Sequence, residues 1–79
     1  MIQFSSDLHR DQYHLGTLAM RFRGTRNQDE RRAIAEEYAQ TVDRLIQSGR
    51  WEEAPTFEDQ LPDEWMPAAF MAYWYDEHP

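Results

Sequence analysis

A stripe of apolar side chains with the period of an α-helix runs through the middle of the chain and is its best-specified feature. The stripe consists of Ile34, Tyr38, Val42, Leu45 and Ile46. Charged residues occupy the opposite face of the same segment, so the pattern predicts an amphipathic helix. Asn27 with Glu30 has the spacing of a capping box at the start of this helix, and Gly49 suits its end.

The segment before this helix supports two interpretations. Leu8, Leu15, Leu18 and Phe22 share one helical face, and Ser6 can cap a helix that runs from about residue 7 to residue 23. Within residues 17–23, however, apolar and polar side chains also alternate, which suits a short strand paired with residues 2–4. We favour the helix and keep the short β element near the N-terminus as the alternative.

The last third of the chain is predicted to form a connector followed by a third helix. Residues 50–61 include Pro55 and lack a helical pattern. The third helix is expected to begin at Pro62 or at Pro67, because proline favours the first turn, and to end near Tyr75. The expected fold is therefore all-α, a single small three-helix domain that spans residues 1–79.

The size of the chain makes its core marginal. A domain of 79 residues is near the limit at which one core sustains a fold, and the absence of cysteine excludes a disulfide. The sequence contains no apolar span of membrane length and no signal-peptide pattern at its start, so we expect a cytoplasmic protein with no membrane contact.

Charge is divided unevenly between the two parts of the chain. Residues 1–50 contain all eight arginines and seven acids, whereas residues 51–79 contain eight acids and no basic residue. The whole chain has a net charge of −7. Such asymmetry predicts an electrostatic interaction surface on the acidic part.

Seven of the eleven aromatic residues also lie in residues 51–79. On a helical wheel the large side chains around Phe70 surround the third helix, so a two-helix hairpin can cover only one side of it. The connector, a second copy or a partner must cover the rest. We predict a partner-binding surface formed by Trp51, Glu52, Glu53, Glu58, Asp59, Asp63, Glu64, Trp65, Tyr73, Trp74 and Tyr75.

Residues that could support catalysis or hold a metal show no productive pattern. His9 and His14 point away from each other on a helix, and His78 lies in the tail. The glycines are isolated, so no phosphate-binding loop is present. The acidic pairs are expected to be solvated rather than catalytic. We therefore predict a non-enzyme with no cofactor and no metal.

Two resemblances are limited in extent. Residues 45–54 resemble the inter-helix turn of a tetratricopeptide repeat, but Pro55 interrupts the helix that would follow, so we interpret them as a shared way of ending a helix. In size and charge the chain is similar to small acidic inhibitors from phages and other mobile elements, including some anti-CRISPR proteins and DNA mimics. This comparison is one of class only.

These features predict a small protein-binding factor, and in the sharpest version an inhibitor, that docks on a basic surface of a nucleic-acid-binding protein. One alternative is a homo-oligomeric structural or adaptor subunit, such as a homodimer formed through the third helix. Another is a small DNA-binding regulator that uses an arginine-rich turn, although the acidic half opposes direct nucleic-acid binding. The residues of that turn are Arg21, Arg23, Arg26, Arg31 and Arg32.

Overall fold

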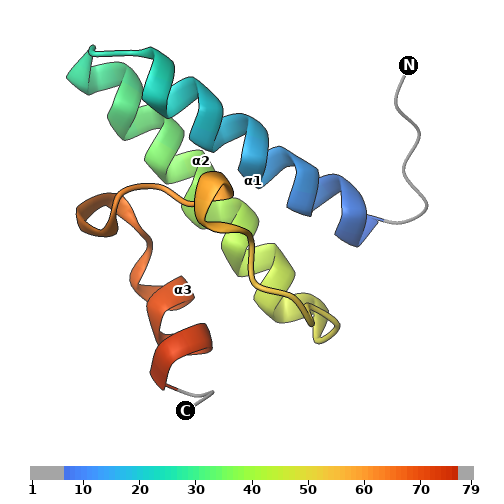
Figure 1. Cartoon of the computed structure of the whole chain (residues 1–79). Helices are drawn as coiled ribbons and strands as arrows, with labels where there is room; N and C mark the ends of the chain where they lie inside the picture. Colours follow the sequence, from blue (N-terminus) through green and yellow to red (C-terminus); the bar gives the residue numbers. More distant parts are fainter. Residues whose placement is uncertain (1–6, 77–79) are drawn as a thin grey trace.

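The computed structural model describes residues 7–76, and all of its regular elements are helical. Helices α1 (Asp7–Gly24) and α2 (Gln28–Ser48) form an antiparallel hairpin (Figure 1). A connector follows, with short turns η1 (Phe57–Asp59) and η2 (Asp63–Trp65), and then α3 (Ala68–Met71) and η3 (Ala72–Asp76). The predicted all-α class with three helices is confirmed.

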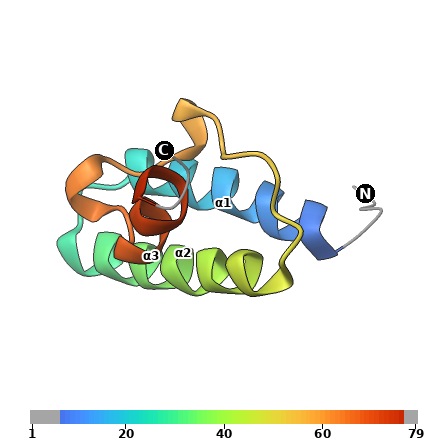
Figure 2. The same cartoon turned by 90° about the horizontal axis from the view of Figure 1, so that it is seen from below.

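The connector and the C-terminal segment pack on the hairpin at different places. Turn η1 contacts α1, whereas α3 contacts α2. Figure 2, seen from below, shows the connector leaving the end of α2, passing α1 and returning to α3 beside α2. The connector therefore lies along α1 for much of its length.

Helix α2 has the ends that its sequence predicts. The Asn27 side chain accepts a hydrogen bond from the Glu30 backbone N–H at 3.0 Å, which satisfies one of the unpaired donors of the first turn. At the other end Gly49 has φ = 69°, and its N–H donates to the Ile46 carbonyl. Only glycine takes this left-handed conformation at little cost, so the helix ends there.

The segment with two interpretations is helical. Residues 17–23 belong to α1, so the alternative strand is wrong for them, and its suggested partner at residues 2–4 lies outside the described residues. Leu15, Leu18 and Phe22 are buried against α2. Burial of this face outweighs the local alternation, because tertiary packing stabilises a helix more than propensity does.

The third helix is shorter than expected. Of the two predicted starting points, Pro67 directly precedes α3, whereas Pro62 precedes only the single turn η2. After Met71 the chain continues to Asp76 in the wider π-helical turn η3. The helical segment thus reaches the predicted end near Tyr75, but in two different geometries.

One core joins all the elements. The apolar faces of α1 and α2 meet, and Trp51, Leu61, Met66 and Phe70 from the rest of the chain complete the cluster. Tyr38 is fully buried at its centre. Among the described residues, no helix is long and apolar enough to cross a membrane.

Candidate functional site

Trp51 joins the connector to the C-terminal segment through aromatic contacts. Its ring stacks on Tyr73 with 5.5 Å between centroids and meets Trp74 edge-on at 5.3 Å. The Tyr73 hydroxyl also donates to the Trp51 carbonyl at 3.1 Å. Because Trp51 is only 3% exposed, it belongs to the core of this chain, and its predicted place on the partner surface is corrected.

The other predicted aromatic residues divide between core and surface. Trp65 packs edge-on against Phe22 at 5.3 Å and is half-buried, as are Tyr73 and Trp74. Tyr75 alone of the predicted aromatic set is mainly exposed, at 60%. Of the three ways to cover the third helix that the sequence allowed, the connector therefore provides much of the cover, through Trp51.

All six predicted acidic residues line a row of open hollows between α1 and the connector. We call this row the acidic seam. Its four hollows have volumes from about 160 Å³ to about 510 Å³. Its carboxylates belong to Glu52, Glu53, Glu58, Asp59, Asp63 and Glu64.

The hollows adjoin one another. Gln12 lines three of them, and Glu53, Asp59 and Arg23 each line two. The α1 side of the seam contributes Leu8 at one end and Arg23 at the other. The seam is therefore a continuous surface feature that follows α1, with its carboxylates supplied by the connector.

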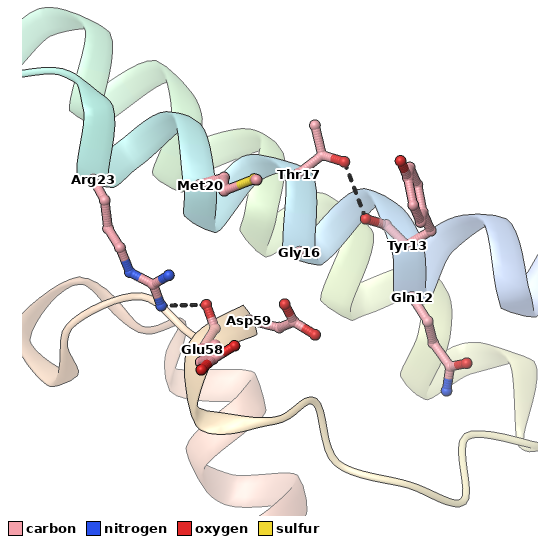
Figure 3. Close-up of a pocket in the computed structure, with 8 residues that line it drawn as sticks. All are labelled: Gln12, Tyr13, Gly16, Thr17, Met20, Arg23, Glu58 and Asp59. Atoms are coloured by element: carbon pink, nitrogen blue, oxygen red, sulfur yellow. Dashed lines mark hydrogen bonds between the residues drawn. The ribbon is translucent and has the colours of Figure 1, made fainter.

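Asp59 lies at the middle of the seam, directly against α1. A Cβ atom on Gly16 would lie only 2.8 Å from an Asp59 carboxylate oxygen, so the glycine makes room for this approach (Figure 3). The Tyr38 hydroxyl donates to the Asp59 backbone carbonyl at 2.8 Å. Burial, and then the nearby Asp59 charge, raises the pKa of Tyr38 well above its ordinary value.

The connector is held by its backbone rather than by its carboxylates. Arg23 donates to the Glu58 carbonyl (Figure 3), Tyr38 donates to the Asp59 carbonyl, and the Gln60 amide donates to the Pro55 carbonyl. None of the six seam carboxylates forms a hydrogen bond or an ion pair with another residue of the described part. Their charge is therefore not consumed by the fold.

The arginine-rich turn is partly engaged within the chain. Arg31 lies 5.0 Å from the centre of the Phe22 ring and donates to the Thr25 carbonyl at 2.9 Å. Arg23 contacts the acidic connector, but at the Glu58 backbone carbonyl instead of a carboxylate. Arg21, Arg26 and Arg32 remain exposed.

Three exposed apolar side chains near the seam were not among the site residues predicted from the sequence. Phe57 is 87% exposed and lines the hollow that also contains Asp63 and Glu64. Met20 and Tyr13, both largely exposed, line the hollow at Asp59. The sequence does indicate the exposure of two of them. Met20 falls outside the helical face shared by Leu15 and Leu18, and Phe57 directly precedes two acidic residues.

The described residues contain no group of three or more metal-ligating side chains. His14 instead pairs with Glu37 of α2 at 3.0 Å, which joins the two helices.

No protein-family model, curated protein or solved structure matches the chain.

Proposed function

We propose that this chain is a small, non-enzymatic protein-binding factor whose acidic seam docks on a basic surface of another protein. The observation that carries the proposal is the row of six carboxylates on one open seam, none of them paired within the described residues. Charges that the fold does not use are available to attract and orient a partner.

An apolar anchor beside these charges favours a protein as the partner. Phe57 is almost fully exposed among Glu58, Asp63 and Glu64. Aromatic side chains supply much of the binding energy at protein interfaces, whereas surrounding charges set the encounter rate and the choice of partner. A basic protein surface with an apolar recess would satisfy both features.

The sharper form of the proposal is inhibition. Many basic protein surfaces bind the phosphates of nucleic acids, and a line of carboxylates can occupy the same cationic side chains. In this form the chain acts in the cytoplasm as a DNA mimic and competes with nucleic acid for its target. Direct binding of nucleic acid by the chain is opposed by its net charge of −7.

Affinity capture with paired variants tests the proposal. The test bait carries Glu58→Lys and Glu64→Lys on the seam, and the control bait carries Glu36→Lys and Asp43→Lys on the exposed face of α2. Both double variants change the net charge equally. Proteins captured by the wild-type and control baits are identified at low and at high salt, and their nucleic-acid binding is measured with and without the chain.

The expected result is a basic protein that binds the wild-type and control baits but is lost from the seam variant and at high salt. Inhibition of its nucleic-acid binding would support the sharper form. Equal capture by all three baits would show that the seam carboxylates do not recognise the partner, and the proposal would then be wrong.

A homodimer is the second candidate, favoured by a different surface. Met71 and Tyr75 are four residues apart along α3 and η3, and both are exposed. An exposed apolar pair at this spacing can pack against its copy. Sedimentation equilibrium of the wild type and of Tyr75→Ser tests this candidate, which requires a dimer that the substitution weakens.

A further inference from the structure

We infer that the acidic seam accepts an extended, arginine-rich segment of the partner, about six or seven residues long, instead of a broad folded surface. This inference rests on the proposed function and specifies the form of the partner. Three observations support it: the length of the seam, its division into adjoining hollows, and the Asp59 carboxylate at its centre, which has no hydrogen-bond or ion-pair partner among residues 7–76.

The length of the seam matches an extended peptide. The hollows follow α1 from Leu8 to Arg23, a stretch of about 22 Å at the rise of an α-helix. An extended chain covers this distance in about six or seven residues. A series of adjoining recesses also suits side chains presented at intervals along a strand, each entering one recess.

The centre of the seam is suited to a guanidinium group. The Asp59 carboxylate lies against Gly16, and Gln12 and Arg23 extend from α1 toward the connector on either side of it (Figure 3). An aspartate can accept two parallel hydrogen bonds from arginine, a geometry that lysine cannot reproduce. Elsewhere in the chain Arg44 donates a single hydrogen bond to the Asp11 carboxylate, at 3.3 Å.

The cations of the seam itself do not neutralise it. Arg23 and Arg50 are the arginines that line the hollows, and His9 lines one of them. Arg23 already donates to the Glu58 carbonyl. Six carboxylates therefore face two arginines, and the surplus of negative charge favours a cationic occupant over a nucleic acid.

The test uses the full chain and one synthetic probe, the peptide acetyl-Ala-Arg-Ala-Arg-Ala-Arg-Ala-amide. Seven residues are too few to form a stable helix, so the probe is extended or disordered before it binds. The ¹⁵N-labelled chain is titrated with the probe at low salt. The same titration is made on two variants that each remove one negative charge. Asp59→Asn removes it from the seam, and Glu36→Gln removes it from the exposed face of α2.

We expect shifted amide resonances to concentrate at Gln12, Gly16, Glu53 and Asp59. Asp59→Asn should weaken binding by about fivefold or more through the loss of a charge-assisted contact. Glu36→Gln should stay within about twofold of the wild type, since an exposed charge away from the site contributes little. A probe with norleucine in place of arginine should not bind.

Equal weakening by the two variants would show attraction by net charge alone and would overturn the inference, as would shifts centred on the outer face of α2. The outcome is separable from that of the proposed function. If charge-dependent capture of a folded partner persists while the peptide leaves the seam unshifted, only the extended-segment inference fails. If capture is independent of Glu58 and Glu64, the proposed function itself fails.

Discussion

The hydrogen bond from Tyr38 to the connector gives a quantitative test of how the seam is held in place. Tyr38 is fully buried in α2, and its hydroxyl donates to the Asp59 backbone carbonyl at 2.8 Å. Tyr38→Phe removes the hydroxyl and keeps the ring, so packing in the core is preserved. The variant therefore isolates one contact between the hairpin and the seam.

The expected cost follows from the surroundings of the two atoms. A net hydrogen bond contributes about 1 kcal/mol, and a buried acceptor left without a donor costs about 1–3 kcal/mol. Because Asp59 is only half-buried, water can reach its carbonyl after the connector relaxes, which favours the lower figure. For a domain of this size, about 1 kcal/mol lowers the melting temperature by roughly 4–8 °C.

Thermal and urea unfolding of Tyr38→Phe measure this cost, and hydrogen exchange locates it. The N–H groups of Asp59 and Gln60 donate within turn η1, to the Thr56 and Phe57 carbonyls. Their exchange should accelerate more than that of the amides in the centre of α2. Tyr75→Phe is the control, because it removes a hydroxyl from an exposed tyrosine and keeps the ring contact with Phe70.

A change in unfolding free energy no larger than that of Tyr75→Phe would refute this reasoning, because the Tyr38 hydroxyl would then contribute nothing to holding the connector. A loss of stability without faster exchange at Asp59 and Gln60 would also contradict it. The cost would in that case come from the core and not from the contact with η1.

The remaining predictions concern pH, one helix end and the seam itself. Because burial raises the pKa of Tyr38, the unfolded chain loses the hydroxyl proton above about pH 10 while the folded chain keeps it. The unfolding free energy is therefore fully retained below that pH and should fall above it by up to about 1.4 kcal/mol per pH unit. Urea unfolding at a series of pH values should show a less steep fall in Tyr38→Phe. Asn27→Ala should lower the unfolding free energy by about 1 kcal/mol and Asn27→Ser should restore it, since serine also caps a helix. In Gly16→Ala the gain in helix propensity, up to about 1 kcal/mol, should offset the cost of displacing the Asp59 carboxylate, so the melting temperature should not fall. Binding of the arginine peptide should nevertheless weaken. Glu58→Gln with Glu64→Gln should leave the melting temperature unchanged or higher at low salt through reduced repulsion, with weaker partner capture.

The hairpin could be predicted from the sequence because its signals are local. The stripe from Ile34 to Ile46, the cap at Asn27 and the glycine at the end of α2 each act within one or two turns of helix. Periodicity and capping follow from backbone geometry, so they are visible without the rest of the fold. The same holds for Pro67, which fixes the start of α3.

The site was predicted only in part because its arrangement is non-local. The acidic residues could be assigned to one surface from the uneven charge of the chain, whereas Trp51 could not be placed in the core without knowing that it stacks on Tyr73. A glycine inside a helix such as Gly16 lowers helix stability, and only the nearby Asp59 carboxylate explains why one stands there. A periodic pattern reports which face is apolar, but not which distant segment covers it.

The way in which the connector is attached explains how so many acids can share one seam. Its contacts with the rest of the chain use the apolar side chains of Trp51, Leu61, Trp65 and Met66. They also use backbone carbonyls, which accept from Arg23 at Glu58, from Tyr38 at Asp59 and from Tyr73 at Trp51. Had the carboxylates held the connector in place, the eight arginines would be expected opposite them. Instead, an arginine–carboxylate pair of the described part, Arg44 with Asp11, joins the two hairpin helices. Repulsion among the seam acids weakens the fold slightly, and a binding role gives a reason for keeping that charge.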